Sequence, residues 1–136
     1  MINVIFGDKG SGKTKEITKM ANEAAAKDYG DVVFIDKNNR YTLALDRKIR
    51  YVDVNDYELR DLRELYGFLS GVIAQNYDID KIYIDGILDM YIQEEGSVEK
   101  FFANLQRLSK DFNVKFYITI SGNPNMAPKF LKEYAL

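Results

Sequence analysis

The chain has 136 residues, of which 46% are hydrophobic and 29% are charged, and its 19 basic and 21 acidic residues give a formal net charge of -2. This length and composition are typical of one folded domain spanning residues 1–136, and they exclude a disordered or collagen-like chain. The sequence contains no cysteine and no histidine, which excludes disulfides, zinc fingers, thiol nucleophiles and histidine-dependent catalytic triads. Any metal ion must therefore be held by oxygen ligands.

The start of the chain is apolar, without a basic leader or a small-residue cleavage site, and no apolar run approaches the ~18 residues that span a bilayer. We therefore expect a cytoplasmic protein with no membrane span. The slightly negative net charge argues against nucleic acid as a partner, because non-specific nucleic-acid binding needs a positive field.

The first half of the chain predicts three strands and two helices. In chain order we expect a strand at 2–6 and, after a glycine-rich turn, a helix that Gly30 stops. A strand at 32–36, an irregular polar segment at 38–50 and a short strand at 51–54 follow. Apolar residues at three- and four-residue spacings then predict a long helix from Asn55 or Asp56 to about Asn76. Gly67 and Gly71 lie within this helix, and we expect them to permit close packing against the sheet.

The second half continues the alternation of strands and helices. We expect a strand at 81–85, an amphipathic helix at 97–111, a strand at 115–120 and a short helix at 129–134 in the tail. This order predicts an α/β fold, a three-layer α/β/α domain with a mostly parallel sheet of four or five strands. In such folds ligands bind beyond the carboxyl ends of the strands, so the functional residues are sought there.

A glycine-rich segment lies between the first strand and the first helix, and its sequence is Gly7-Asp8-Lys9-Gly10-Ser11-Gly12-Lys13-Thr14. It matches the pattern GxxxxGK[ST] at every fixed position. Glycines let the backbone N–H groups turn inward around a phosphate, and the following helix adds its positive end. Lys13 is placed to reach the β- and γ-phosphates of a nucleotide, and the Thr14 hydroxyl is placed to bind Mg²⁺. The alternative is a chance glycine-rich turn.

With this segment the sequence resembles the P-loop NTPases, and the whole chain resembles short bacterial P-loop ATP-binding proteins. The resemblance implies the P-loop NTPase fold, binding of ATP with Mg²⁺, and a second acidic residue that follows an apolar strand and orders the metal ion. Asp85 after Ile82-Tyr83-Ile84 fits that residue. Because another strand precedes this one, the order resembles the additional-strand ATPase division, which implies that 115–120 inserts between 2–6 and 81–85.

The sequence departs from this division where many members carry a glutamate that activates water. Gly86 follows Asp85 directly, so the usual base is missing. Asp36, at the end of the second strand, is a candidate substitute catalytic residue, as are Glu94 and Glu95 in the following loop. The alternative, which the sequence favours, is that Asp36 is an ordinary strand-ending residue.

Two further sets of residues have open roles. Thr119, Ser121 and Asn123 lie at or beyond the end of the last strand, where related ATPases sense the γ-phosphate, or they form a simple turn. Arginines that could contact a phosphate, or be solvated surface charge, are Arg40, Arg47 and Arg50. The guanine-reading NKxD motif is absent from the sequence, which argues for an adenine nucleotide.

These observations lead to one expected function and one alternative. The first is an ATP- and Mg²⁺-binding protein that hydrolyses ATP slowly or on stimulation by a protein partner or by self-association, or that acts as a nucleotide-dependent regulator. The alternative is a small-molecule kinase that transfers the γ-phosphate of ATP to a bound acceptor. In both, Lys13 and Asp85 belong to the reactive centre.

Overall fold

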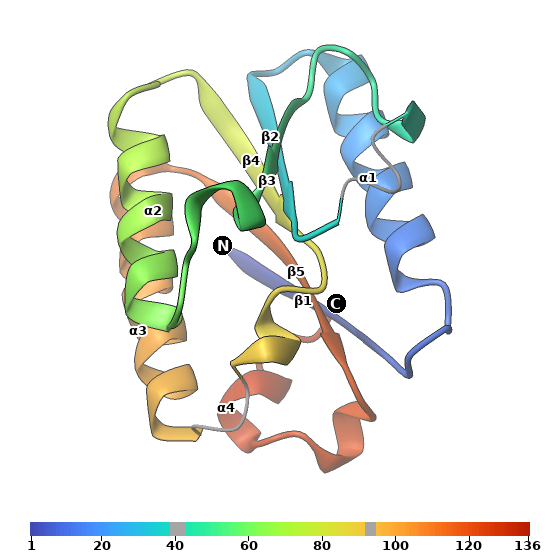
Figure 1. Ribbon diagram of the computed structural model, residues 1–136, viewed down its shortest axis with the longest axis vertical. Helices are drawn as coiled ribbons and strands as arrows, with labels where there is room; N and C mark the ends of the chain where they lie inside the picture. Colours follow the sequence, from blue (N-terminus) through green and yellow to red (C-terminus); the bar gives the residue numbers. More distant parts are fainter. Residues whose placement is uncertain (39–42, 92–94) are drawn as a thin grey trace.

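The computed structural model describes residues 1–38, 43–91 and 95–136, and five of its segments form one sheet (Figure 1). The strands are β1 (Ile2–Gly7), β2 (Asp31–Asp36), β3 (Arg50–Asp53), β4 (Ile79–Ile84) and β5 (Lys115–Ser121). Their order across the sheet is β1-β5-β4-β2-β3, and every neighbouring pair is parallel. The predicted α/β class with a parallel sheet is confirmed.

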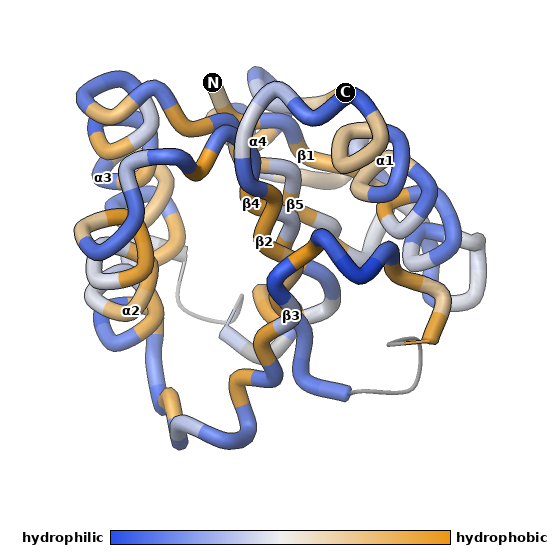
Figure 2. The backbone as a smooth tube through the Cα atoms, turned by 90° about the horizontal axis from the view of Figure 1, so that it is seen from above, coloured by the Kyte–Doolittle hydropathy of each residue, from blue (hydrophilic) through white to orange (hydrophobic). Residues whose placement is uncertain are grey.

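Helices cover both faces of the sheet and complete three layers (Figure 2). Helix α1 (Lys13–Lys27) lies on one face, and α2 (Leu62–Ala74) and α3 (Glu95–Phe112) lie on the other, while the short α4 (Lys129–Lys132) follows β5. No helix in the part of the chain that the structure describes is long and apolar enough to cross a membrane. The three-layer α/β/α architecture is that expected from the sequence.

Each face of the sheet has its own buried apolar cluster. In β4, Ile82 and Ile84 pack toward α2 and α3, whereas Tyr83 between them packs toward α1. A central parallel strand is buried on both faces, and for this reason β4 has the uninterrupted apolar sequence Ile82-Tyr83-Ile84. On the α1 side Ile17 and Ala21 supply the helix contribution to the cluster.

The position of β5 between β1 and β4 confirms the insertion expected from the sequence. It brings the carboxyl ends of β1, β5, β4 and β2 into one row. The residues at or directly after those ends are Gly7, Ser121, Asp85 and Asp36. Segments that are far apart in sequence thus supply the chemistry of one sheet edge.

The prediction of one long helix from Asn55 or Asp56 is wrong, because the segment is divided. A 3₁₀ helix at Val54–Tyr57 ends at Glu58, which has a left-handed φ of 51°. Helix α2 begins at Leu62, and Asp61 caps it by accepting a hydrogen bond of 2.8 Å from the Glu64 amide. A left-handed residue interrupts helical hydrogen bonding, so a new cap was required.

Glycines also behave differently from expectation. Helix α1 ends at Asp28, which is left-handed with φ 55°, rather than at Gly30. Gly30 is instead needed at the start of β2, where an added Cβ would lie 2.8 Å from Asp80 Cβ and 2.9 Å from the Asp78 carbonyl oxygen. Gly67 and Gly71 are exposed with open space around them, so the close packing that we expected there is wrong.

The tail runs back along the free edge of β1. The Val4 amide donates to the Tyr134 carbonyl at 2.8 Å, and the Leu136 amide donates to the Val4 carbonyl at 2.9 Å. The helix predicted at 129–134 is the shorter α4, whose Leu131 is buried. This contact fixes β1, and with it the start of the glycine-rich loop.

Candidate functional site

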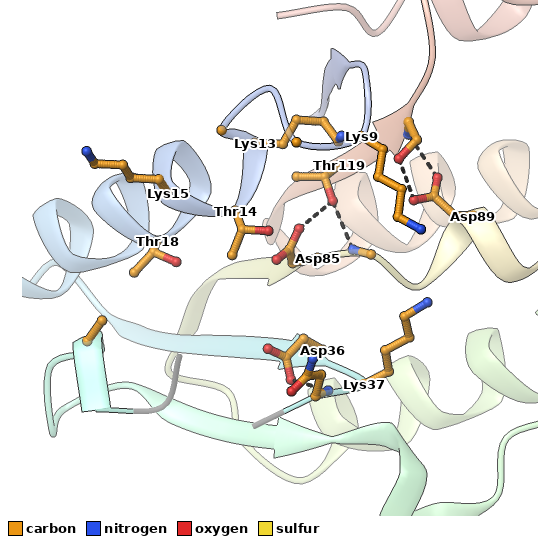
Figure 3. Close-up of a pocket in the computed structure, with 16 residues that line it drawn as sticks. Lys9, Lys13, Thr14, Lys15, Thr18, Asp36, Lys37, Asp85, Asp89 and Thr119 are labelled. Carbon is orange, nitrogen blue, oxygen red and sulfur yellow. Dashed lines mark hydrogen bonds between the residues drawn. The ribbon is translucent and has the colours of Figure 1, made fainter. Parts of the chain in front are cut away.

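A cavity of about 930 Å³ opens at the carboxyl edge of the sheet (Figure 3). Its walls come from the glycine-rich loop, the first turns of α1, the ends of β2, β4 and β5, and Ala44. This volume lies toward the upper end of the roughly 300–1,000 Å³ that small-molecule sites occupy. The cavity therefore lies where the sequence predicts the functional residues.

Two glycines give the loop its shape. Gly10 has φ 84°, and Gly12, which precedes the first residue of α1, has φ 93°. Residues with a Cβ rarely adopt such angles, so glycine is required at both positions. At Gly7 the reason is space, because an added Cβ would clash with Ser11 Oγ and lie 3.0 Å from Lys13 Cγ.

Backbone hydrogen bonds hold the loop against the sheet and the helix. The Ser11 amide donates to the Asp8 carbonyl at 2.9 Å, and the Gly122 amide donates to the Gly7 carbonyl at 2.9 Å. The second bond joins the loop directly to the residue after β5. The loop is thus anchored at its start to the residue after β5, and at its end to α1, where the Glu16 amide donates to the Gly12 carbonyl at 3.0 Å.

Of the eight residues predicted to bind a nucleotide, five line the cavity, namely Lys9, Gly10, Gly12, Lys13 and Thr14. The other three, Gly7, Asp8 and Ser11, shape the loop but are not part of the cavity wall. The Lys13 ammonium donates to the Asp8 carbonyl at 3.0 Å and so lies across the loop. This places its charge at the Asp8 end of the loop.

Four lysines line the cavity: Lys9, Lys13, Lys15 and Lys37. Within the described ranges none of them is in an ion pair with a carboxylate. Their charge adds to the positive end of α1, which begins at the same loop. This side of the cavity is therefore electrostatically suited to an anion such as a phosphate chain.

Asp85 follows β4 and is held in a fixed orientation inside the cavity. The Thr119 hydroxyl donates to Asp85 Oδ1 at 2.7 Å and accepts from the Gly86 amide at 2.9 Å. Both side chains are buried, with 8% of Asp85 and 1% of Thr119 exposed. Because the bond from Thr119 reaches Oδ1, Asp85 can use Oδ2 toward a ligand. Thr119, a candidate γ-phosphate sensor, instead orients Asp85.

Asp36 lies at the end of β2 and also lines the cavity, with 5% of the residue exposed. Its Oδ1 accepts hydrogen bonds from the Tyr51 hydroxyl and, at 3.1 Å, from the Asn38 amide. Burial raises the pKa of Asp36 above its usual value, the two hydrogen bonds oppose that shift, and the charges of Asp85 and Asp53 add to it. A carboxyl with a raised pKa beside a cavity is suited to proton exchange.

Asp89 is a cavity residue that sequence reasoning missed. The Ser121 amide donates to its Oδ1 and the Ser121 hydroxyl to its Oδ2, both at 2.8 Å. Figure 3 shows Asp89 across the cavity from Thr14, beside the Lys9 side chain. No local pattern marks Asp89, because its partner is 32 residues away in sequence.

Thr18 is a second residue that was missed. It lies one helical turn beyond Thr14 on α1, and both residues line the same cavity (Figure 3). Thr18 is 9% exposed, and its hydroxyl has no hydrogen-bond partner among the described residues. The four-residue spacing from Thr14 was a usable signal, since residues at i and i+4 share a helix face.

Several other candidates do not enter the cavity. Asn123 Oδ1 accepts from the Asn125 amide at 2.9 Å and caps the 3₁₀ helix Pro124–Met126. Arg47 and Arg50 are exposed and are not part of the cavity wall, whereas Arg40 and Glu94 lie outside the described residues. Glu95 is described only as the first residue of α3. Of the candidate bases, the structure therefore places Asp36 in the cavity.

The residues in the cavity fit a magnesium ion only in part. Thr14 and Asp85 offer oxygen atoms, which Mg²⁺ prefers. Among the described residues there is no group of three or more acidic, histidine or cysteine side chains that could hold a metal. Mg²⁺ is usually bound by one or two carboxylates together with waters and substrate phosphates. This donor set thus fits a metal ion that enters with a nucleotide.

No model of a known protein family matches the sequence, and a search of curated proteins found no match either. The cavity is therefore interpreted from its own residues and geometry.

Proposed function

We propose that this chain is a P-loop protein of the additional-strand ATPase division that binds ATP with Mg²⁺ in the cavity at the carboxyl edge of the sheet. The observation that carries the proposal is the loop itself. Gly10 and Gly12 have left-handed backbone angles that turn the loop into the start of α1. The Lys13 side chain lies across the loop, with its ammonium 3.0 Å from the Asp8 carbonyl. Such a loop offers amides, a helix N-terminus and a lysine to one phosphate chain.

The proposed metal position is between Thr14 and Asp85. Thr14 lines the cavity from α1, and the Asp85 carboxylate is oriented by its bond from Thr119. The two side chains would hold Mg²⁺ there, and the ion would neutralise phosphate charge. The absence of an NKxD motif in the sequence favours adenine over guanine nucleotides.

We further propose that hydrolysis by the isolated chain is slow, or that it is stimulated by a protein partner or by self-association. Gly86 stands where related ATPases carry a glutamate, so the carboxylate that usually activates water is missing. Asp36 is the buried carboxyl with a raised pKa in the same cavity, and it is the proposed proton acceptor. A chain that binds ATP but turns it over rarely is suited to regulation by nucleotide occupancy.

Calorimetric titration of the purified protein with ATP, ADP and GTP, with and without Mg²⁺, tests the proposal. We expect saturable binding of the adenine nucleotides and loss of at least about tenfold in affinity in Lys13→Ala, because one charge-assisted contact to phosphate is worth about 1.5–3 kcal/mol. Lys19→Ala is the matched control, since Lys19 is exposed on the same helix and is not part of the cavity wall.

Equal affinity of the wild type and Lys13→Ala for ATP would contradict the proposal. We expect the fold to persist in Lys13→Ala, because among the described residues the Lys13 side chain bonds to the exposed loop. Circular dichroism and thermal unfolding of both variants check that any loss is one of binding. Release of inorganic phosphate, measured on the same samples, separates slow hydrolysis from binding alone.

A further inference from the structure

Lys37 is a cation of the cavity to which the proposed ATP site gives no role. It directly follows β2 and lines the cavity with an exposed side chain (Figure 3). Asp36, Asp85 and Asp89 line the same cavity, yet among the described residues Lys37 forms no ion pair with any of them. Its ammonium therefore remains available to an anion that enters the cavity.

The backbone at Lys37 is held in place by hydrogen bonds on both sides. The Asn38 amide donates to Asp36 Oδ1 at 3.1 Å, and Asn55 Nδ2 donates to the Lys37 carbonyl. The first bond closes a tight turn directly after β2, and the second joins this turn to the 3₁₀ helix Val54–Tyr57. The Lys37 side chain thus leaves the sheet edge from a fixed position, which lowers the cost of ordering it on a ligand.

The end of the Lys37 side chain lies close to the proposed metal position. A Cβ added at Gly86 would lie 3.9 Å from Lys37 Cε, and Gly86 directly follows Asp85 in the sequence. The ammonium is one bond beyond Cε, so it lies near the residue that follows the proposed metal ligand. Lysine has a flexible four-carbon stem, and its ammonium can turn toward a phosphate that is bound at this place.

The order of the strands gives the direction in which a phosphate chain would run. The phosphate loop follows β1, Asp85 follows β4 and Lys37 follows β2, and the strand order is β1-β5-β4-β2-β3. Asp85 therefore lies between the loop and Lys37 along the sheet edge (Figure 3). A magnesium ion bound with a nucleotide bridges β- and γ-phosphate oxygens. With the β-phosphate in the loop and the metal at Asp85, the terminal phosphate would lie on the side of Lys37.

We propose that Lys37 contacts the terminal phosphate of ATP and thereby makes the cavity prefer ATP to ADP. The inference rests on the proposed ATP site, because the phosphate loop and Lys37 line one cavity. ADP ends at its β-phosphate, which the loop holds, so ADP does not reach Lys37. The proposal makes Lys37 a residue that determines which nucleotide occupies the site.

The test is calorimetric titration with ADP and with the β,γ-imido analogue of ATP, both in the presence of Mg²⁺. The analogue carries a terminal phosphate but is not hydrolysed to ADP, so each titration reports on one nucleotide. In Lys37→Met the affinity for the analogue should fall by about tenfold, because one charge-assisted hydrogen bond is removed. The affinity of this variant for ADP should equal that of the wild type.

Two features of the design isolate the contact. Methionine keeps the unbranched shape of the lysine side chain and removes its charge, and binding of ADP by Lys37→Met shows that the variant is folded. Lys48→Met is the matched control, since Lys48 is exposed and is not part of the cavity wall. Its affinities for both nucleotides should be those of the wild type.

The ratio of the two affinities distinguishes this inference from the proposed function. If neither nucleotide binds to the wild type, the proposed ATP site fails. If both bind and the ratio of analogue affinity to ADP affinity is the same in the wild type and Lys37→Met, Lys37 does not contact the terminal phosphate and the inference is overturned. An equal fall of that ratio in Lys48→Met would also overturn it, because the effect would then come from net charge.

Discussion

The hydroxyl of Thr119 joins the end of β5 to the end of β4 by donating to Asp85 Oδ1 at 2.7 Å while it accepts from the Gly86 amide at 2.9 Å. The Thr119 side chain thereby provides a hydrogen-bond partner for the buried Asp85 carboxylate and for the Gly86 amide, which follows the end of β4. Since Asp85 is the proposed metal ligand, its orientation depends on a residue 34 positions away in sequence.

We predict that Thr119→Val destabilises the protein by about 1–3 kcal/mol, because the substitution leaves both the Asp85 carboxylate and the Gly86 amide without this partner. Valine has nearly the same shape as threonine, so the change tests the hydroxyl rather than the packing. Urea denaturation followed by circular dichroism measures the effect. Thr119→Ser should lose much less, and an equal loss in both variants would assign the effect to the missing methyl group.

For Asp85→Asn we expect the fold to persist, because an amide oxygen can still accept the hydrogen bond from Thr119. The loss of charge should instead reduce the part of ATP affinity that depends on Mg²⁺, by about tenfold or more. Binding of ATP in the presence of a chelator should change little. Calorimetry under the two conditions checks this, and an equal loss with and without Mg²⁺ would show that Asp85 holds structure and no metal.

The parts of the site that were predicted from sequence depend on neighbouring residues. The segment Gly7 to Thr14 could be identified because its glycines, lysine and threonine stand in one short pattern, and Asp85 because it ends an apolar run. The position of β5 between β1 and β4 was implied by the resemblance to the additional-strand division, and it is confirmed. The pairing of Asp89 with Ser121 was not predictable, since it arises only when β5 lies beside β4.

The start of α2 was mispredicted for a different physical reason. Asp53, Asn55, Asp56 and Asp61 can all cap a helix, and sequence alone does not decide among them. Asp53 caps the 3₁₀ helix, and Asp61 caps α2 while the Glu64 carboxylate accepts from the Arg60 amide at 2.6 Å. The two side-chain bonds of Asp61 and Glu64 resemble a capping box, with the Arg60 amide in place of the Asp61 amide, and they mark the start of α2.

The raised pKa of Asp36 makes its contribution to stability depend on pH. Its pKa in the folded protein lies above the ordinary value of 3.8, chiefly because of burial. Ionised Asp36 therefore destabilises the fold, and the penalty is absent below pH 3.8, grows as the pH rises through the folded pKa and is constant above it. We predict that Asp36→Asn is more stable than the wild type at pH 7.

Urea denaturation of wild type and Asp36→Asn between pH 3.5 and 7 tests this linkage, since the difference in free energy of unfolding should shrink toward the acid end of the range. The Asn38 amide and the Tyr51 hydroxyl can still donate to the amide oxygen, so the local hydrogen bonds persist. A difference that is constant over the whole range would mean that the carboxyl charge is not its source.

Thr18→Val should stabilise the ligand-free protein by about 1 kcal/mol, because it removes a buried hydroxyl that has no partner among the described residues. Thermal unfolding of the wild type and Thr18→Val in the absence of nucleotide measures the gain. A loss of stability would show that the hydroxyl already has a partner in the folded protein.

Gly12→Ala and Gly67→Ala should have opposite effects on stability. Gly12 has φ 93° at the start of α1, so alanine there is strained and should cost about 1–2 kcal/mol. Gly67 is exposed within α2 with open space for a Cβ, so alanine should stabilise the protein by about 0.5–1 kcal/mol. Denaturant midpoints of the two variants and the wild type provide the comparison. If Gly12→Ala were as stable as Gly67→Ala, the loop would not need its left-handed turn, and the phosphate cradle argued from that turn would have to be abandoned.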